Sequence, residues 1–508
     1  MILARYSVAA LVSLAACTAQ AAVVINPVPA PIAPGVRVGI SLFGQAQETR
    51  PVPRDRNRTR LQGLRPVPDA SGRLFVHDTR GTISVVGASG GTPQTWFDIR
   101  TVVPGFSNAR GPNQSGLMSF AFHPNFAGNP AQPGYGVFYT IDTSLPTGTA
   151  TLTGKGPTVN NDNILHEFRV ADPGAATATI IGQREVLRMA QTGSGHGLGT
   201  VGFNPLAAPG SADYGNIYIS QGDGGGVGDP FGNAQDLTSP LGKILRINPA
   251  AGPNGEAYTI PADNPYVGEA GKLGEIWASG LRNPQQFSWD SSTGRMLIID
   301  IGQSRLEEVN VGVAGGNYGW PLREGTFARG SSSTDPNVYT LPANDGSFVD
   351  PISQFDHEEL ERTTDYTLTG IGSAFAYTGS AVPELFGKVV LTELVSGRIF
   401  YFDQSAVPAG PISTSPAPMF ELGLEMNGVP VTLSVLDGNP LLANRVDLRL
   451  GTDGNGELFL LSKTHGNIYA VNSLLGVPEP QTWAMLLAGF GLVGALQRRE
   501  RKAGRLAN

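Results

Sequence analysis

Short β-like runs separated by turn residues constrain the fold of this chain more than any other feature. From about residue 61 to residue 471, apolar and β-branched runs alternate with clusters of Gly, Asn, Asp and Pro. Residues 137–141, 216–220 and 399–402 are three such runs, and residues 453–456 (Asp-Gly-Asn-Gly) carry a hairpin signal. The 508 residues include 67 Gly and 39 Pro without a collagen period, so these residues indicate tight turns between strands.

So many hairpins in one region predict a β-propeller. Repeated four-stranded blades close a ring and leave only short, protected edges. Long amphipathic helical patterns are absent from the sequence. We therefore predict an all-β propeller domain over residues 61–474, with a pair of β-sandwiches as the alternative. Residues 23–60 are rich in Pro, Arg and polar residues, and we expect an irregular segment there.

Charge and cysteine content exclude some classes of partner. The net charge is −7, only 15% of the residues are charged, and there is no basic stripe, so nucleic acid is not an expected partner. The single cysteine, Cys17, lies in the N-terminal segment, so a processed chain has no intrachain disulfide. Stability must then come from the core, and bound cations are a further candidate source.

Residues 1–22 have the pattern of a secretory signal peptide. Arg5 supplies the positive start, residues 8–16 the apolar run, and Ala19-Gln-Ala21 a cleavage site of small residues. A core helix is the alternative interpretation. Residues 14–17 (Leu-Ala-Ala-Cys) also resemble a lipoprotein box, which leaves lipidation of Cys17 open.

Residues 477–502 have the three-part pattern of a second targeting signal. Val477-Pro-Glu-Pro480 precedes an apolar run over 483–496, and a basic cluster follows at 498–502. The run is short for a full span, which needs about 20 residues, so we expect a short hydrophobic helix. The pattern resembles the PEP-CTERM sorting signal of Gram-negative bacteria. This resemblance implies export, transient inner-membrane anchoring, processing by an exosortase-type peptidase and release to the surface or extracellular matrix, whereas the alternative is a plain membrane tail.

Five motifs in a fixed order resemble those of one known family. They are residues 114–126, 196–204, 222–246, 280–284 and 300–321, the last containing Gly302-Gln303 and Gly315-Gly-Asn-Tyr-Gly-Trp-Pro321. Together they resemble the soluble glucose/sorbosone dehydrogenases, six-bladed propellers that use pyrroloquinoline quinone (PQQ). The resemblance covers residues from about 70 to 471. Parts of 222–226 and 302–310 look closer to the hedgehog-interacting-protein-like branch.

The resemblance implies roles for four residues of a catalytic and cofactor site. His196 aligns with the general base that removes the proton of the sugar's anomeric hydroxyl, a task that suits a neutral imidazole. Arg282 and Asn283 align with residues that contact the quinone and stabilise negative charge on its oxygens. Gln114 aligns with a residue at the sugar pocket. A structural histidine, and a buried pair between Arg282 and a nearby glutamate, are the alternatives.

The resemblance also implies two calcium sites. Gly302 and Gln303 align with the positions whose backbone carbonyls hold the calcium of the cofactor, and oxygen ligation suits that cation. Glu307 and Glu308, with the Tyr318 carbonyl, align with a second, structural calcium site. The alternative for the two glutamates is an ordinary solvated pair. A third acidic, Gly-rich loop carries Asp223, Asp229 and Asp236 and is a candidate cation site without EF-hand spacing.

The sequence departs from the family where the carboxylates of PQQ are bound. Val395 stands where a lysine is expected, Gly224 where a glutamine is expected, and the expected arginine pair before Asp447 is reduced to Arg445. Each lost charge-assisted contact costs roughly 1.5–3 kcal/mol. Further cations that can compensate are Lys388, Arg398 and Arg449.

Three functions remain open from sequence. The first is an exported, calcium-containing PQQ-dependent dehydrogenase that oxidises a sugar or polyol at its anomeric carbon and passes electrons to an acceptor that the sequence does not identify. The second is a non-catalytic surface propeller that binds polysaccharide or protein in the extracellular matrix. The third is a propeller-type metal-dependent lactonase, which needs converging carboxylate side chains.

Overall fold

The described part of the chain is built almost wholly of β-strands. The computed structural model describes residues 22–28, 32–51, 57–108, 115–193, 195–330, 332, 335–341, 346–357, 370–407, 415–438 and 446–474. The predicted signal peptide up to residue 21, residues 477–502, Gln114 and Arg445 lie outside these ranges. Within them the helical elements are α1 (Leu433–Leu436) and the 3₁₀ turns η1 (Ile99–Thr101), η2 (Pro383–Leu385) and η3 (Gln404–Ala406). The predicted all-β class is confirmed.

Most strands form antiparallel sheets whose members follow one another along the chain. The first sheet contains β3 (Leu61–Pro66), β4 (Leu74–Asp78), β5 (Thr82–Val86) and β6 (Gln94–Asp98). The second contains β7 (Leu117–Phe122), β8 (Val137–Ser144), β10 (Thr158–Val170) and β11 (Ile180–Thr192), with β9 (Leu152–Thr153) parallel to β11. Tight hairpins join such strands, and Gly81, with φ of 115°, supplies a backbone conformation that other residues rarely adopt.

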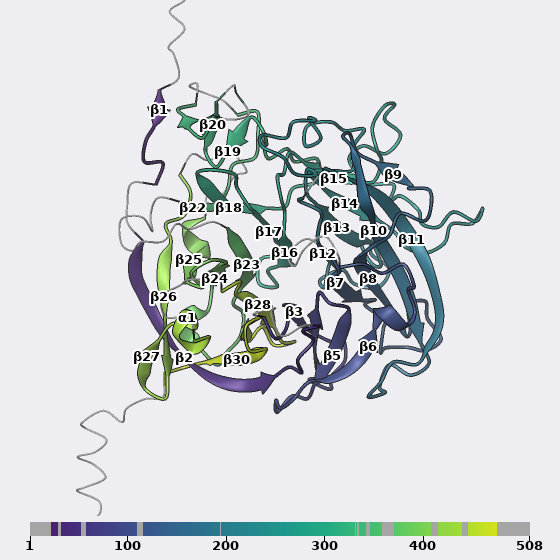
Figure 1. Ribbon diagram of the computed structural model, residues 1–508, viewed down its shortest axis with the longest axis horizontal. Coiled ribbons are helices and arrows are strands. Elements are labelled where there is room, and N and C mark those ends of the chain that lie inside the picture. Colours follow the sequence, from purple (N-terminus) through teal and green to yellow (C-terminus); the bar gives the residue numbers. More distant parts are fainter. Residues whose placement is uncertain are drawn as a thin grey trace, which may run out of the picture.

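The next two sheets repeat this arrangement. One contains β12 (Leu198–Phe203), β13 (Ile217–Gln221), β14 (Lys243–Ile247) and β15 (Ile276–Ser279). The other contains β16 (Gln286–Trp289), β17 (Met296–Asp300), β18 (Leu306–Val311) and β22 (Ser353–Asp356). Each sheet begins with the strand that lies nearest the centre of the molecule (Figure 1).

A nine-stranded sheet completes the arrangement. One half contains β23 (Ile371–Ala376), β24 (Lys388–Glu393), β25 (Ile399–Asp403) and β26 (Phe420–Met426), with β27 (Val429–Val431) paired to β26. The other half contains β28 (Arg449–Thr452), β29 (Leu458–Leu461) and β30 (Asn467–Asn472). The strand β2 (Ala33–Gln45) lies between β26 and β30 and joins the two halves.

The first strands of these groups form a closed ring around a common axis. β3 contacts β7, β7 contacts β12, β12 contacts β16, β16 contacts β23, β23 contacts β28, and β28 contacts β3 again. Figure 1 shows these six strands around the centre, with the remaining strands of each group further out. We call β3, β7, β12, β16, β23 and β28 the ring strands. The arrangement is propeller-like, as the sequence predicts.

Strand β2 corrects the prediction of an irregular segment over 23–60. It pairs antiparallel with β30, with Ser41 opposite Ala470, and parallel with β26, with Val38 opposite Leu424. The prediction was wrong for residues 33–45 because the Pro and Arg content hides a strand pattern. Val36, Val38 and Ile40 alternate with polar or small residues, which is the period of a half-buried strand, and Val38 and Ile40 are buried.

The end of β2 is held close to the first sheet. Gly44 forms a parallel bridge with Gly91, on the turn between β5 and β6. A Cβ atom on Gly44 would lie 2.3 Å from the carbonyl oxygen of Gly91, so only glycine permits this approach. The N-terminal segment therefore contacts both the last sheet, through β30, and the first sheet, through the turn between β5 and β6.

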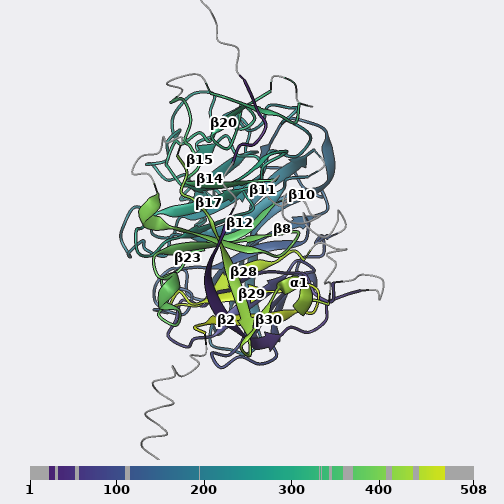
Figure 2. The ribbon, with the colours of Figure 1, turned by 90° about the vertical axis from the view of Figure 1, so that its left-hand side faces the viewer.

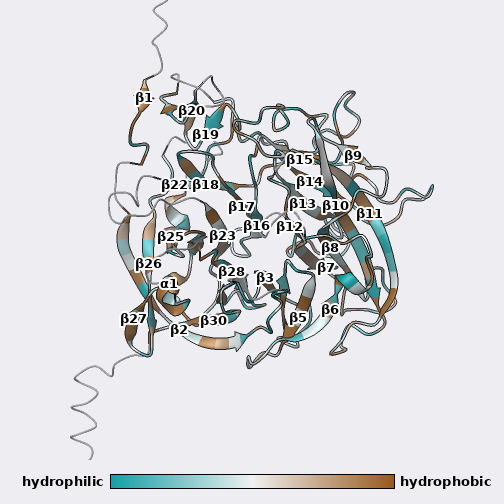
Figure 3. Cartoon of the chain, in the orientation of Figure 1, coloured by the Kyte–Doolittle hydropathy of each residue, from teal (hydrophilic) through white to brown (hydrophobic). Residues whose placement is uncertain are grey.

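The core lies between the faces of neighbouring sheets. Strands β7 and β8 are buried at every residue because sheets pack against both of their faces. Between the first two sheets the packing is aromatic, and the rings of Trp96 and Phe138 lie 5.0 Å apart in an edge-to-face arrangement. Figure 3 shows hydrophobic residues along inner strands such as β23, whereas the outer strand β11 is hydrophilic over much of its length.

A small additional sheet lies outside the ring. It contains β1 (Val23–Val24), β21 (Val338–Tyr339), β20 (Phe327–Arg329) and β19 (Arg323–Glu324). Its last three strands are inserted between β18 and β22, and β1 brings the N-terminal residues to them. Figures 1 and 2 both place β20 at the edge of the molecule opposite β2 and β30. This insertion also supplies side chains to the candidate site.

Candidate functional site

Five of the predicted site residues lie in loops at one end of the ring strands β12 and β16. His196 precedes β12 by two residues, and Arg282 and Asn283 lie just before β16. Gly302 and Gln303 lie two and three residues after the end of β17, which runs antiparallel to β16 with Gln286 opposite Ile299. The start of one strand and the end of its antiparallel neighbour lie at the same edge of a sheet, so these loops converge.

His196 is held by a buried carboxylate. Its Nδ1 lies 2.7 Å from Oδ1 of Asp223, whose side chain is fully buried. The His196 backbone has φ of 45°, an uncommon value for a residue with a side chain, and its carbonyl oxygen would lie 2.4 Å from a Cβ atom on Gly222. A neutral imidazole whose Nδ1–H donates to Asp223 carries its proton-accepting lone pair on Nε2. The geometry therefore fits the role of a base.

Asp223 connects His196 to two other parts of the site. Its Oδ1 accepts from the backbone N–H of Gly225 at 2.8 Å, and its Oδ2 accepts from the Trp320 indole Nε1–H at 2.8 Å. Its own backbone N–H donates to the carbonyl oxygen of Arg282 at 2.9 Å. Asp223 was predicted from the sequence to belong to a candidate cation loop, but in the structure it orients the His196 imidazole.

Arg282 lies against Trp320 and donates to the loop after β17. Its guanidinium carbon is 5.6 Å from the centre of the Trp320 ring. Its Nη1 donates to the carbonyl oxygens of Ile301 at 2.8 Å and of Gly302 at 2.7 Å. Its buried Nε has no hydrogen-bond partner among the described residues. These contacts join His196, Asp223, Trp320, Arg282 and Gly302 in one connected group, which we call the His196 site.

Asp300 positions the turn that carries Arg282 and Asn283. Its two carboxylate oxygens accept from the backbone N–H groups of Arg282 at 2.8 Å and of Asn283 at 2.6 Å. Burial raises the pKa of Asp300 well above its ordinary value, and the charge of Glu308 adds to this effect. The Asn283 side chain is buried, and its Oδ1 accepts from Gln285 at 3.2 Å.

The loop of Gly302 and Gln303 is tightly folded over a carboxylate. A Cβ atom on Gly302 would lie 1.6 Å from the carbonyl oxygen of Leu306, so this position requires glycine. Oε1 of Glu324, from the small additional sheet, accepts from the backbone N–H groups of residues 303–306 at 2.8–3.1 Å. Oε1 of Gln303 accepts from Gly228 at 2.6 Å. The loop conformation is thus fixed by the protein.

Glu307 and Glu308 are buried, so the interpretation as an ordinary solvated pair is wrong. Glu307 contacts Nε2 of His357 at 2.7 Å and accepts from the Ile371 backbone at 3.0 Å. Glu308 accepts from Asn310 at 3.1 Å, and burial raises its pKa to about 7.

At the predicted calcium sites, the Tyr318 side chain is bound to the backbone. The Tyr318 hydroxyl donates to the Val311 carbonyl oxygen at 2.6 Å. Within the part of the chain that the structure describes, no three His, Cys, Asp or Glu side chains are grouped as a metal site. Calcium ligation at Gly302, Gln303 and Tyr318 therefore relies on backbone carbonyl oxygens and stays a prediction.

The acidic loop after β13 is built around a cation of the chain itself. The fully buried Lys243 donates from Nζ to the carbonyl oxygens of Asn233 at 2.7 Å, Ala234 at 3.0 Å and Leu241 at 2.7 Å. Burial lowers the pKa of Lys243 to about 7, although nearby carboxylates oppose this shift. The loop that sequence analysis considered for a bound cation thus surrounds an ammonium group, and the carboxylates of Asp229 and Asp236 accept backbone N–H groups.

The structure places the candidate compensating cations unequally. Lys388 pairs with Asp403, and Arg398 pairs with Glu421, so each already has a carboxylate partner. Arg449 lies on the ring strand β28, within 3.5 Å of Asp447. Sequence analysis missed a fourth cation, the buried Lys463, whose Nζ lies 2.5 Å from Oδ2 of Asp447. The signal was a lysine two residues after the predicted run that became β29.

The turn at Val395 is held by the carboxylate of Glu393. The side chain of Glu393 accepts from the backbone N–H groups of Val395 at 2.7 Å and Ser396 at 2.6 Å. The Val395 carbonyl oxygen accepts from Val446 at 3.0 Å, so this turn packs beside Asp447. Lys463 therefore brings a positive charge to the neighbourhood where the sequence lacks the expected lysine.

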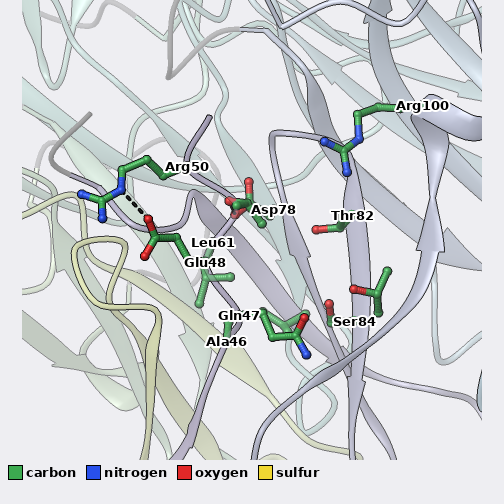
Figure 4. Close-up of a pocket in the computed structure, with 12 residues that line it drawn as sticks. Ala46, Gln47, Glu48, Arg50, Leu61, Asp78, Thr82, Ser84 and Arg100 are labelled. Carbon is green, nitrogen blue, oxygen red and sulfur yellow. Dashed lines mark hydrogen bonds and ion pairs between the residues drawn. The ribbon is translucent and has the colours of Figure 1, made fainter. Parts of the chain in front are cut away.

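A separate cavity of about 260 Å³ lies beside the first sheet, away from the His196 site. Residues 46–50 form one wall, and side chains of β4, β5 and β6 form the other. Figure 4 shows Asp78, Thr82, Ser84 and Arg100 around this space. Sequence analysis did not predict it, since it depends on where β2 ends.

The comparisons with known proteins identify the class. The model of the glucose/sorbosone dehydrogenase family matches residues 60–409, and the chain belongs to this family. The PEP-CTERM protein-sorting motif matches residues 476–502. Both resemblances found in the sequence are confirmed.

Particular relatives lie in both branches that the sequence resembles. The chain is 27% identical over 447 residues to the HIPL1 protein of Arabidopsis thaliana, covering 80% of this chain and 60% of that protein. It is 26% identical over 281 residues to quinoprotein glucose dehydrogenase B of Acinetobacter calcoaceticus, covering 52% of each. The PQQ-bound aldose sugar dehydrogenase of Streptomyces coelicolor has the same fold, with a TM-score of 0.53, 20% identity, and coverage of 87% of this chain and 99% of that one. The chain thus spans about three-fifths of its curated relative HIPL1.

Proposed function

We propose that this protein is an exported quinoprotein dehydrogenase that oxidises a sugar or polyol at its anomeric carbon. The connected His196 site carries the proposal, because it combines an oriented imidazole with a guanidinium on one end of a closed ring. We assign the domain as a six-bladed propeller, since the six ring strands each begin a group of at least four strands when β2 is counted with β28, β29 and β30.

The residues present fit PQQ and calcium at the His196 site. The buried Nε of Arg282 has no acceptor among the described residues, which suits an oxygen of a bound quinone. The Gly302 carbonyl oxygen accepts from Arg282, but a carbonyl oxygen has two lone pairs and can also ligate calcium. Arg282 and Asn283 would hold the quinone, and Gly302 and Gln303 would hold the cation. Bound PQQ would supply the acceptor for the hydride that leaves the sugar.

The mechanism requires one proton acceptor and one oriented substrate. Nε2 of His196 takes the proton of the anomeric hydroxyl while the carbon–hydrogen bond breaks and its electron pair leaves as hydride, so a cyclic aldose becomes a lactone. Asp223 keeps the Nδ1–H tautomer and stabilises the imidazolium that forms. Arg282 stabilises negative charge on the acceptor, and its guanidinium lies 5.6 Å from the centre of the Trp320 ring.

Reconstitution of the purified protein tests the proposal. PQQ titrated into calcium-loaded protein should quench intrinsic fluorescence at micromolar concentration, and sugars with a free anomeric hydroxyl should then reduce an artificial electron acceptor. Chelation of calcium should weaken PQQ binding, and Arg282→Ala should do the same. The proposal fails if PQQ does not bind at micromolar concentration in the presence of calcium.

A second candidate is a non-catalytic propeller that binds polysaccharide or protein at the surface. The loss of the lysine at Val395 favours it, since a charge-assisted contact to a carboxylate of the cofactor is missing there. Glycan binding that is independent of PQQ and unchanged by His196→Ala would support this candidate over the first.

The sorting motif supports a location at the cell surface. We propose that residues 477–502 anchor the exported chain in the inner membrane until an exosortase-type peptidase releases it, and that residues 1–22 direct export. In the part of the chain covered by the structure, no helix is long and apolar enough to cross a membrane. Replacing the Pro-Glu-Pro residues at 478–480 should leave the protein in the membrane fraction.

A further inference from the structure

The cavity of about 260 Å³ beside the first sheet is formed by the fold itself, and we call it the side cavity. One of its walls consists of residues 46–50, which follow β2. This wall is held in place by the Ala46 N–H, which donates to the Gly466 carbonyl oxygen at 2.8 Å, and by the Thr49 hydroxyl, which donates to the Asp78 carboxylate at 2.6 Å. The cavity is therefore preformed, as sites for small molecules usually are.

The opposite wall presents hydroxyl groups that the protein itself does not use. Thr82 and Ser84 lie on β5, and Thr95 of β6 is paired with Ser84, so the three side chains share one face of the sheet. In the described part of the chain, these hydroxyls and the Gln47 amide have no hydrogen-bond partner. Thr82 is only 8% exposed, and its hydroxyl points into the cavity (Figure 4). A nearly buried hydroxyl of this kind takes its partner from what occupies the cavity.

The charged side chains around the side cavity already have partners. The Asp78 carboxylate accepts from two backbone N–H groups, at 2.7 and 2.8 Å, and from the Thr49 hydroxyl. Glu48 forms ion pairs with two arginines, and Arg100 forms a bidentate pair with Asp98 at 2.8 and 2.6 Å. The groups that remain for a ligand are therefore mainly neutral donors and acceptors.

The size and the lining of the side cavity fit a single sugar ring. Its volume is just below the range of roughly 300–1,000 Å³ that is typical of sites for drug-sized ligands. Leu61 and Val76 add apolar surface beside the hydroxyls, and a sugar ring has C–H groups as well as hydroxyls. Each hydroxyl of a sugar both donates and accepts, as Ser and Thr hydroxyls do, and a Gln amide offers both functions as well. We propose that the side cavity binds one neutral sugar or polyol unit through the three hydroxyls and the Gln47 amide.

This binding site is separate from the His196 site. It lies on the first sheet, whereas His196 and Arg282 precede strands of two other sheets. A terminal unit of a polysaccharide that binds in the side cavity holds the protein on a carbohydrate matrix and leaves the His196 site open. The inference does not depend on dehydrogenase activity, since it involves neither PQQ nor His196.

Ligand-observed NMR on the purified protein without PQQ tests the proposal. The probes are sorbitol and the methyl glycosides of glucose, galactose and mannose, which are neutral and have no free anomeric hydroxyl. At least one of them should receive saturation transfer from the protein at millimolar concentration. Glucuronate, which carries a carboxylate, should bind no more tightly than the neutral probe. The proposal is wrong if no neutral probe binds at millimolar concentration or if glucuronate alone binds.

Variants show whether the probe binds in the side cavity. Thr82→Val keeps the shape of the side chain and removes a hydroxyl without a partner in the described chain, so the thermal midpoint should not fall. The double variant Thr82→Val/Thr95→Val should bind the neutral probe about tenfold more weakly, the equivalent of two neutral hydrogen bonds. Thr92→Val is the matched control, because Thr92 is exposed on the turn between β5 and β6 and does not line the cavity. Equal affinity in the double variant and the control contradicts the assignment.

His196→Ala separates the side cavity from the proposed reaction site. Binding of the neutral probe should be the same in His196→Ala as in the wild type, because the side cavity is intact. Loss of binding in His196→Ala, together with full binding in the double variant, would place the sugar at the His196 site and overturn the inference. That outcome would leave the proposed dehydrogenase function standing, so the two proposals fail separately.

Discussion

Replacing Asp223 by asparagine is the sharpest test of the His196 site. Asp223 accepts from His196 and Gly225 through one oxygen and from Trp320 through the other. Asparagine has the same shape but only one accepting oxygen. If that oxygen faces His196, the amide N–H₂ meets the indole N–H of Trp320. If the amide flips, it donates to Nδ1 of His196 and leaves the hydrogen on Nε2.

Both arrangements have a calculable consequence. Losing one hydrogen bond to a charged acceptor costs about 1.5–3 kcal/mol of stability. The flipped arrangement removes the basic lone pair from Nε2, and the comparable change in a catalytic triad lowers turnover about 10⁴-fold. We expect kcat of the PQQ-reconstituted variant to fall by about 10³- to 10⁴-fold, with a smaller change in KM.

The assay compares Asp223→Asn with a matched control. Asp229→Asn makes the same change in the same loop, where, among the residues that the structure describes, the Asp229 side chain accepts from the backbone of Asn233 and Ala234. Turnover is followed with an artificial electron acceptor over a pH series, and ¹⁵N NMR of the His196 imidazole reports its tautomer. If turnover of Asp223→Asn stays within about threefold of the control, His196 is not the base that this geometry orients.

Three further predictions concern stability. Burial opposes protonation of His166, but the Asp142 carboxylate at 2.9 Å outweighs it and raises the pKa of His166. The pair therefore stabilises the fold fully below about pH 6.5, and this contribution is lost as the pH rises through the raised pKa. His166→Gln should remove this pH dependence from the urea unfolding midpoints, and an unchanged pH dependence contradicts the assignment. Gly44→Ala should lower the free energy of unfolding by about 1–3 kcal/mol, because its Cβ would meet the Gly91 carbonyl oxygen. Gly87→Ala, which has open space around it, should change the free energy of unfolding little. Equal losses of stability in denaturant titrations would be inconsistent with a contact effect. Lys243→Met leaves three carbonyl oxygens without their donor and should lower the free energy of unfolding by at least about 3 kcal/mol. Amide hydrogen exchange at residues 233–241 should rise more than elsewhere. A uniform rise in exchange would show that the lysine does not hold this loop.

The sequence was sufficient for the fold class because the hairpin pattern is local. Runs such as residues 137–141 and 399–402 became parts of β8 and β25, since both faces of each strand are covered by neighbouring sheets. Strand β2 was missed because its partners β26 and β30 lie nearly four hundred residues or more further along the chain. Residues 33–45 carry no local signal of these distant partners, and the Ala33-Pro34-Gly35 start hides the alternation that follows it.

The candidate site shows a similar limit. The order of the motifs indicated His196 and Arg282, but the residues that connect these two side chains depend on how the chain packs. Asp223 was grouped with Asp229 and Asp236 because all three lie in one acidic stretch, whereas the structure directs only the first toward the imidazole. The cation of that stretch is Lys243, and a lysine inside a strand gives no sequence signal that its ammonium turns back to three carbonyl oxygens.

If the chain is exported as proposed, the placement of β2 has a consequence for the order of events during secretion. This segment would then cross the membrane well before the strands that it joins, which span residues 420–472. Until those residues have also crossed, the first and last sheets have exposed edges that other chains can pair with. The sorting motif begins at residue 476, only four residues after β30, so a membrane anchor in this motif would lie close to the strand that completes the ring. Such an anchor would keep each exported molecule at the membrane while β2 pairs with β26 and β30.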